Sequence, residues 1–315
     1  MMRTFEYRED RFPKGVNMEH IETATTPDIP SIPLTDSVSI PQIGFGVFQI
    51  SASTTQQAVE QALEIGYRHI DTAAAYYNER GVGDALRATG MADKVFVTSK
   101  LRNCDQGYDA ARVAFDTTLA NLGLDHLDLY LIHWPFPAVN QYVETWKALL
   151  ELQQEGVIRA AGVSNFLPEH LRRLIDETGK APAIDQLEVH PSFSQPETLR
   201  FCKDHGIAVE AYSPLGHGSD MQAEPIRQAA EAHRVTPAQV VLRWHVQSGR
   251  VIIPKSTHAE RMRQNLDVFG FELTAEEMRG ISALHDPANR VGADPATFVQ
   301  SQSWANQKSR GNIPD

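Results

Sequence analysis

The sequence predicts an α/β protein built on a closed (β/α)8 barrel, a TIM barrel, with an N-terminal β-hairpin and additional helices. From about residue 43, short β-branched runs alternate with longer amphipathic stretches, and strands that alternate with helices form parallel sheets. Eight such units over about 250 residues match the repeat number and length of this barrel. The 315 residues, 42% of them hydrophobic, are enough to bury such a core.

The first predicted element is a hairpin at residues 32–44, where two short strand-like runs flank Thr35, Asp36 and Ser37. These residue types favour a turn, and we expect the hairpin to close the bottom of the barrel. An open doubly wound sheet is the alternative. However, GFGVFQ at residues 44–49 lacks the third glycine and the helix start of a dinucleotide-binding fingerprint.

The barrel strands are expected in runs rich in β-branched residues, at 43–48, 68–73, 95–100, 127–133, 158–165, 183–190, 207–213 and 250–256. Helical periodicity is clearest in amphipathic stretches that end at a glycine, as helices often do, at 54–66, 109–123, 142–156 and 167–179. Two further helical patterns, at 224–235 and 236–249, both lie between the seventh and eighth strands. One of these two helices is therefore an insertion into the barrel repeat.

The overall charge narrows the class of partner. A net charge of -11 and a pI near 5.5 argue against nucleic acid and anionic membranes, which bind basic faces, so we expect a small-molecule substrate. Two cysteines, Cys104 and Cys202, are compatible with a reducing compartment. No apolar run approaches the roughly 20 residues of a membrane span. We expect a cytoplasmic protein, and a monomer because no long apolar heptads occur.

Three parts are predicted along the chain. Residues 1–30 mix charges, prolines and polar residues without periodicity, which is typical of a disordered tail. Residues 31–298 are expected to form the single barrel domain, and residues 299–315 a C-terminal tail.

Polar residues stand at the ends of the predicted strands, where barrel active sites lie. Asp71 ends the second strand, Lys100 the third and His133 the fourth. Because strand side chains alternate between faces, residues two and four positions earlier share each residue's face, and these are mostly apolar before Lys100 and His133. The same parity predicts that Asn165 shares the interior face with Ala161 and Val163. Further polar strand ends are Ser164, Gln186, Glu188, Tyr212, Ser213, Lys255 and Ser256.

Taken singly, these residues have ordinary structural interpretations. An Asp at a strand end usually caps a turn, a His is usually a hydrogen-bonded core residue, and a Lys is usually solvated. Three of them ending successive strands on one face favour a shared role. Tyr76, five positions after Asp71, adds a phenol. A lysine ammonium about 4 Å away stabilises phenolate by roughly 4 kcal/mol, so we expect Lys100, oriented by Asp71, to bring the phenol's pKa down toward neutrality. His133 would orient a substrate oxygen or share in proton transfer. Glu210, on the face of Tyr212, has no role that the sequence indicates.

Several motifs together resemble the aldo/keto reductases, in that family's order from about residue 33 to 298. The matching segments are GFGVF, GYRHIDTAAAYYNE, SKL, LDLYLIHWP, GVSNF, DQLEVHP, AYSPLG, TPAQVVLRWHVQSG, IPKS and RMRQNLDVFGFEL. Within the family the sequence is most similar to the bacterial 2,5-diketogluconate reductase group. The resemblance implies a barrel that binds NADPH or NADP without a Rossmann fold and reduces an aldehyde or ketone by hydride transfer.

The resemblance also implies roles for individual residues. Tyr76 would be the general acid of a catalytic tetrad with Asp71, Lys100 and His133. Substrate-facing positions would be Phe48, Tyr76, His133 and Trp134. Cofactor-binding positions would be Val47, Phe48, Asp71, Ser164, Asn165, Gln186, Tyr212, Ser213, Leu215, Lys255, Ser256, Thr257, Arg261, Gln264 and Asn265.

Among the cofactor positions, Ser164, Asn165 and Gln186 would hold the nicotinamide carboxamide and Tyr212 would stack on its ring. Lys255, Ser256 and Arg261 suit a 2′-phosphate, since two cations and a hydroxyl match a dianion. NADP is therefore preferred over NAD.

Two other functions are alternatives. A metal-dependent barrel hydrolase would need clustered His and Asp ligands at strand ends, but the twelve histidines are scattered and no HExxH occurs, so we expect no metal. A catalytically weak NADPH-binding redox-sensor subunit is the second alternative, and an intact tetrad weighs against it.

Overall fold

The computed structural model describes residues 28–299, so most of both predicted tails lies outside the described residues. Its main sheet has eight parallel strands in the order β10-β9-β8-β7-β6-β5-β4-β3. Each strand falls within one of the predicted runs, or extends one residue past it. They are β3 (Phe45–Gly46), β4 (His69–Asp71), β5 (Phe96–Leu101), β6 (Leu127–Ile132), β7 (Ile158–Ser164), β8 (Ile184–Glu188), β9 (Ala208–Tyr212) and β10 (Val251–Ile252).

The sheet closes on itself between its first and last strands. A parallel bridge joins Ile43 to Ile252. The Gly44 N–H donates to the Ile252 carbonyl at 2.8 Å, and the Ile252 N–H donates to the Gln42 carbonyl at 3.0 Å. The predicted closed barrel is therefore confirmed.

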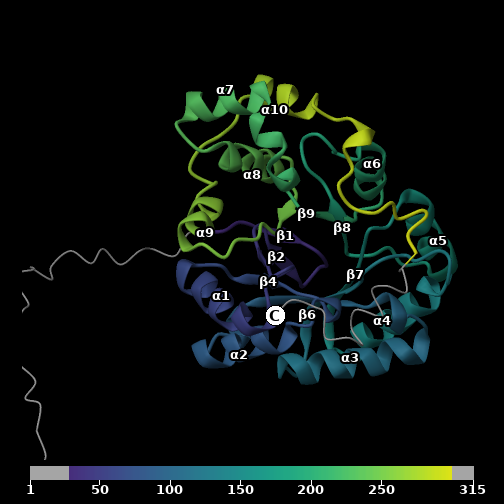
Figure 1. Cartoon of the computed structure of the whole chain (residues 1–315). Helices are drawn as coiled ribbons and strands as arrows, with labels where there is room; N and C mark the ends of the chain where they lie inside the picture. The colour runs from purple at the N-terminus through teal and green to yellow at the C-terminus, as the bar shows by residue number, and fades with distance from the viewer. Residues whose placement is uncertain (1–27, 300–315) are drawn as a thin grey trace, which may run out of the picture.

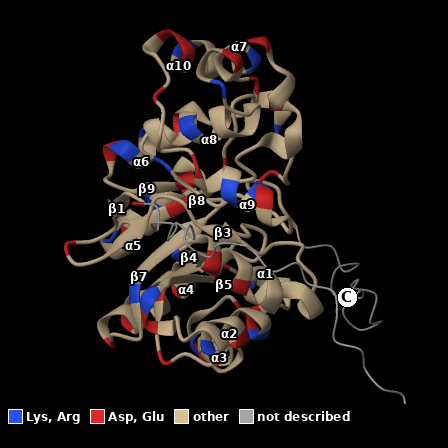
Figure 2. Ribbon diagram, turned by 90° about the vertical axis from the view of Figure 1, so that its left-hand side faces the viewer, with Lys and Arg blue, Asp and Glu red and all other residues tan. Residues whose placement is uncertain are grey.

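Helices surround the strands (Figure 1). They are α1 (Ala52–Ile65), α2 (Glu79–Thr89), α3 (Tyr108–Leu122), α4 (Tyr142–Gln154), α5 (Pro168–Thr178), α6 (Pro196–Asp204), α7 (Glu224–His233), α8 (Pro237–Gln247), α9 (Ala259–Leu266) and α10 (Ala275–Ser282). As predicted, α7 and α8 both lie between β9 and β10. Lys and Arg residues and Asp and Glu residues are intermixed along the outer helices (Figure 2).

The barrel interior forms a small apolar cluster of its own, separate from the larger core between the strands and the helices. Strands β5 to β8 and β10 contribute to it together with the N-terminal hairpin, through Val38, Ile40, Phe96, Leu129, Leu131, Ala160, Ile184 and Val251. The hairpin pairs β1 (Ser31–Pro33) with β2 (Ser39–Pro41). The hairpin therefore packs against the interior residues and closes the barrel as predicted.

The predicted interior face is confirmed for the residues below Lys100 and His133 but wrong for Ala161 and Val163, which were expected below Asn165. Leu129 and Leu131 belong to the interior cluster, as expected below His133. On β7, however, the interior residue is Ala160, whereas Ala161 and Val163 pack in the outer core under the helices. Asn165 follows the end of the strand with a φ of 64°, so strand alternation no longer governs its direction.

One close approach of helices depends on a glycine. A Cβ atom at Gly83 of α2 would lie 2.0 Å from the carbonyl oxygen of Leu122 in α3. We predict that Gly83→Ala lowers the free energy of unfolding by about 3 kcal/mol or more, because a rigid backbone atom occupies the site. Gly280→Ala in α10 is the control, since its Cβ would meet Pro225 at an ordinary 3.6 Å. It should stabilise by up to about 1 kcal/mol. Urea unfolding measures both, and equal midpoints would contradict the prediction.

Candidate active site

A buried lysine, Lys100, contacts two of the predicted site residues, Asp71 and Tyr76, at the ends of the barrel strands. The Lys100 ammonium contacts both carboxylate oxygens of Asp71 at 2.7 Å and the carbonyl oxygen of Thr72 at 2.9 Å. It also lies 3.4 Å from the Tyr76 hydroxyl. The Lys100 side chain has no exposed surface and that of Asp71 is 2% exposed. The three groups expected to act together therefore lie in direct contact.

The local backbone explains why Tyr76, and not Tyr77, faces the lysine. Asp71 ends β4, and the chain then enters a short 3-10 turn at Ala74–Tyr76. Tyr77 ends this turn in the left-handed region, with a φ of 58°. The Asn78 side chain then donates to the carbonyls of Val47 and Ile50 at 2.9 and 3.2 Å, which fastens the loop to the segment after β3.

Burial dominates the electrostatics of this cluster. Burial lowers the pKa of Lys100, but Asp71, together with Tyr76 and Glu210, more than offsets this, so the pKa of the lysine lies above its ordinary value. Burial raises the pKa of Tyr76, and Lys100 only partly opposes it, so the pKa of the phenol is also raised. The expectation that Lys100 brings the phenol's pKa toward neutrality is therefore wrong for this structure, because desolvation of the phenolate outweighs the lysine.

His133 is the fourth member of the predicted tetrad. Its ring meets the Tyr76 ring edge to face, with centroids 5.7 Å apart. Burial, aided by the charge of Lys100, lowers the pKa of His133 to about 3. The imidazole is therefore neutral near pH 7 and carries one ring N–H donor.

A cavity of about 790 Å³ opens above these residues at the ends of the strands. Among the predicted residues, those that line it are Phe48, Asp71, Tyr76, His133, Trp134, Ser164, Asn165, Gln186, Tyr212, Ser213, Leu215, Lys255 and Arg261. Five predicted cofactor residues do not line it. Val47 packs in the outer core, and the remaining four, on the segment after β10, are Ser256, Thr257, Gln264 and Asn265.

Several cavity residues were missed by the sequence analysis. Arg102, Asn103 and Cys104 come directly after β5, and the segment at 291–299 reaches the cavity from the far end of the described chain. Arg102 directly follows the SKL motif at the end of a predicted strand, and this position indicates a place at the rim of the barrel. The C-terminal residues carry no such signal, because their place depends on contacts with distant segments.

Polar side chains beneath the cavity form a connected network. Gln186 donates through Nε2 to Asp71 at 2.8 Å and to Glu210 at 2.6 Å. Tyr212 donates through its hydroxyl to Oδ1 of Asn165 at 2.8 Å, and Asn165 donates through Nδ2 to the His133 carbonyl at 3.0 Å. Both N–H groups of Gln186 are thereby used. Its carbonyl oxygen Oε1 has no hydrogen-bond partner among the described residues.

Glu210, which the sequence left without a role, is a buried carboxyl group in this network. No cation lies within hydrogen-bond distance of it among residues 28–299. The nearest ring nitrogen, of His69, is 3.8 Å away, and burial lowers the pKa of that histidine to about 3. Burial, with the nearby charge of Asp71, raises the pKa of Glu210 from 4.5 to about 8. Glu210 is therefore a neutral acid near pH 7.

The C-terminal segment is fastened over the cavity by β8. Glu188 accepts hydrogen bonds from the backbone N–H groups of Val291 and Gly292 at 2.6 and 2.7 Å. Glu188 also pairs with His190 at 3.3 Å. Further along the segment, Phe298 stacks on Trp134 with ring centroids 4.3 Å apart. An aromatic wall is thus held on one side of the cavity.

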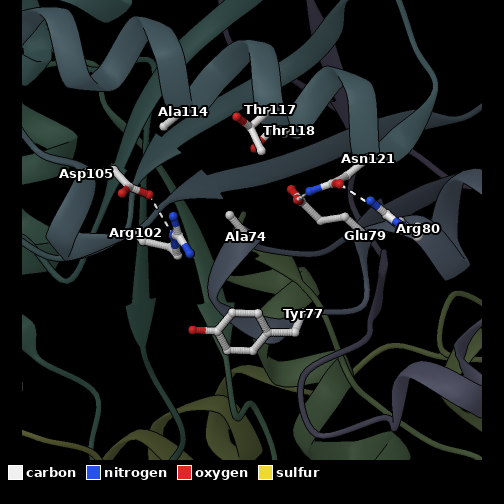
Figure 3. A pocket seen from close by; sticks show the side chains of 10 residues that line it. All are labelled: Ala74, Tyr77, Glu79, Arg80, Arg102, Asp105, Ala114, Thr117, Thr118 and Asn121. Carbon is white, nitrogen blue, oxygen red and sulfur yellow. Dashed lines mark hydrogen bonds and ion pairs between the residues drawn. The ribbon is translucent and has the colours of Figure 1, made fainter. Parts of the chain in front are cut away.

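A smaller cavity of about 290 Å³ lies beside the main one, between the 3-10 turn and helices α2 and α3 (Figure 3). It shares Tyr77 and Arg102 with the main cavity. Several polar side chains line it, and among them Glu79 accepts from Ser99 at 2.7 Å and from Asn121 at 3.2 Å. The other lining residues are Ala74, Arg80, Asp105, Ala114, Thr117 and Thr118.

Within residues 28–299, no three or more His, Cys, Asp or Glu side chains are grouped so that they could hold a metal ion. In the same part of the chain, none of the helices has the length and apolar character needed to cross a bilayer.

The raised pKa of Glu210 makes stability depend on pH. The unfolded chain releases this proton near pH 4.5 and the folded chain near pH 8, so folded-state stability falls as pH rises through that window. The Gln side chain of Glu210→Gln stays neutral. We therefore predict that the free energy of unfolding of this variant rises relative to that of the wild type between these pH values, by on the order of a few kcal/mol at pH 8. Urea unfolding at pH 5, 7 and 8.5 tests this. A difference between the two proteins that is constant across pH would contradict it.

Comparison with known proteins agrees with this geometry. Residues 42–286 match the model of the aldo/keto reductase family. An aldo-keto reductase of Mycolicibacterium smegmatis is 51% identical over 270 residues, which cover 85% of this chain and 98% of the relative. Methylglyoxal reductase DkgA of Escherichia coli K12 is 46% identical over 270 residues, covering 85% and 97%.

Solved structures give the same result. The crystal structure of a Gox0644 mutant in complex with NADPH is 44% identical and has a TM-score of 0.84, covering 87% of this chain and all of that one. Bombyx mori aldo-keto reductase in complex with NADP is 34% identical with a TM-score of 0.78, covering 88% and 97%. The barrel, the buried Asp–Lys–Tyr contact and these matches lead to one conclusion: the chain belongs to the aldo/keto reductase family.

Proposed function

We propose that this protein uses NADPH to reduce the aldehyde or ketone group of a small substrate to an alcohol, with Tyr76 as the general acid. The observation that carries the proposal is the contact of the Tyr76 hydroxyl with the Lys100 ammonium at 3.4 Å. That ammonium is held by Asp71 at 2.7 Å, at the floor of a cavity large enough for a nicotinamide and a small carbonyl compound.

The proposed roles follow from protonation states. NADPH, when bound, supplies the hydride that attacks the carbonyl carbon. Tyr76, protonated near pH 7 because its pKa is raised, gives its proton to the carbonyl oxygen. Lys100 stabilises the phenolate that this leaves, and Asp71 keeps the lysine charged. Neutral His133 donates its ring N–H to the same oxygen and orients the carbonyl.

Cofactor binding is proposed for three groups of residues. Because both N–H groups of Gln186 are used by carboxyl groups, its Oε1 is left to accept from the carboxamide NH₂ of nicotinamide. Tyr212 is tethered through its hydroxyl, so its ring face remains free for stacking. Lys255 and Arg261 line the cavity and would bind the 2′-phosphate. The NADPH complex of the Gox0644 mutant, a similar protein, supports this cofactor.

The substrate is proposed as a small carbonyl compound, such as methylglyoxal, another aldehyde or a diketo sugar acid. Phe48, Trp134 and Phe298 give the cavity apolar walls, which suits small and partly apolar molecules. Two of the similar proteins, from Yersinia pestis and Escherichia coli, are named methylglyoxal reductase DkgA, which supports methylglyoxal as a first test substrate.

Tyr76→Phe tests the acid directly. We predict that kcat for methylglyoxal falls by about 100-fold or more, since general acid catalysis typically contributes that much, while the Kd for NADPH stays within about twofold. Tyr108→Phe, at a tyrosine that does not line the cavity, is the control and should keep its activity. Steady-state absorbance of NADPH and fluorescence titration measure the two quantities. Equal losses in both variants would reject Tyr76 as the acid. Binding of NADPH by the wild type without turnover of any carbonyl compound would favour a sensor.

Lys255→Ala combined with Arg261→Ala tests the phosphate site. Each charged hydrogen bond is worth about 1.5–3 kcal/mol, so the preference for NADPH over NADH should fall at least 10-fold when both cations are lost. Arg263→Ala on the same helix, α9, is the control, because Arg263 does not line the cavity. The ratio of the two Kd values measures the preference, and an unchanged ratio would refute the assignment.

A further inference from the structure

The charged side chains around the main cavity are Asp71, Arg102, Glu188, Lys255 and Arg261. Four of them already have partners or a proposed one. Asp71 is paired with Lys100, and Glu188 accepts from the C-terminal segment and pairs with His190. The two cations near β10 are proposed for the cofactor phosphate. Arg102 pairs with Asp105 through Nε, and its two terminal nitrogens are the charged donors in this wall that are left to meet the substrate.

Arg102 is held so that its donor edge stays available. It follows β5 directly, and its Nε donates to Oδ2 of Asp105 at 2.6 Å. Neither of its terminal nitrogens, Nη1 and Nη2, has a hydrogen-bond partner among residues 28–299. Its side chain is 26% exposed, and in Figure 3 it lies between Asp105 and Tyr77. One edge of the guanidinium is thus fixed, and the terminal nitrogens remain as a pair of donors.

The neighbouring residue adds a second unmet polar group. Asn103 also lines the main cavity, and its Oδ1 is buried without a hydrogen-bond partner among the described residues. Its amide nitrogen has no partner there either. Oδ1 is an acceptor, and burying it without a donor is costly unless a ligand or water donates to it. Arg102 and the Asn103 NH₂ group therefore present donors side by side in the cavity wall, with the Asn103 Oδ1 acceptor next to them.

The shape of a suitable ligand group follows from these donors. A guanidinium with two free terminal nitrogens binds a carboxylate in bidentate fashion. Asp105 offsets part of the positive charge, but it accepts from Nε alone and leaves Nη1 and Nη2 available as donors. Phe48, Trp134 and Phe298 add aromatic surfaces to the cavity wall.

We propose that Arg102, assisted by Asn103, binds the carboxylate of the substrate, so that the enzyme prefers small aldehydes or ketones that carry a carboxylate group. This inference rests on the proposed function and names its substrate class. The reacting carbonyl meets Tyr76 and His133, the body of the molecule packs on the aromatic wall, and the carboxylate lies at the turn after β5.

The test uses two aldehydes of nearly equal size, 4-carboxybenzaldehyde and the neutral 4-formylbenzamide. The measured quantity is the ratio of their kcat/KM values. The wild type should favour the carboxylate about 10-fold or more, and Arg102→Gln should lower the ratio by about 10- to 100-fold, as loss of a charged hydrogen-bond pair requires. Arg102→Lys keeps the positive charge but cannot form two parallel hydrogen bonds to a carboxylate, and should give an intermediate ratio.

Arg80→Gln is the control, because Arg80 lines the small cavity but not the main one, and its ratio should equal that of the wild type. A ratio unchanged in Arg102→Gln, or a wild type that reduces both aldehydes equally well, would overturn the inference and leave the proposed function intact. A wild type that reduces neither aldehyde nor methylglyoxal would overturn the proposed function, and the inference with it.

Discussion

The ion pair between Lys100 and Asp71 is the contact on which the rest of the site depends. Both groups are almost fully buried, and removing two charges from water costs several kcal/mol for each ion before their attraction is counted. The pair is stable only because the lysine contacts both carboxylate oxygens and the Thr72 carbonyl. Lys100 lies on β5, Asp71 on β4 and Thr72 directly after β4. The barrel strands themselves therefore fix the position of the ammonium that contacts Tyr76.

One cation can neutralise one carboxylate, and this limit explains Glu210. With Lys100 committed to Asp71, a second ionised carboxylate in the same interior would carry an uncompensated charge, so Glu210 keeps its proton instead. Gln186 donates to both carboxyl groups. These two carboxyl groups therefore fix the orientation of the Gln186 amide, which leaves Oε1 as its unpaired acceptor. Burial likewise keeps His133 neutral.

The sequence predicted what depends on local pattern and strand parity. Eight strands, the hairpin and the inserted helix could be located because apolar periodicity is local, and Asp71, Lys100 and His133 because strand ends meet at one rim. Ala161 and Val163 were placed on the wrong face, and Asn165 reaches the cavity because its left-handed φ ends the alternation that parity assumes. The contact of Phe298 with Trp134 joins segments more than 150 residues apart, and neither segment's composition indicates it.

The two halves of the site differ in how they are supported. Asp71, Lys100, Gln186 and Glu210 lie on strands that neighbouring strands hold on both sides. The groups proposed to set the preference among substrates lie outside the strands: Arg102 and Asn103 follow β5, and Phe298 lies on the C-terminal segment, which is fastened through Glu188. Changes in these segments leave the buried ion pair in place, since none of its contacts runs through them. The arrangement therefore permits the preference for substrate to change while the acid, the lysine and the carboxylate keep their geometry.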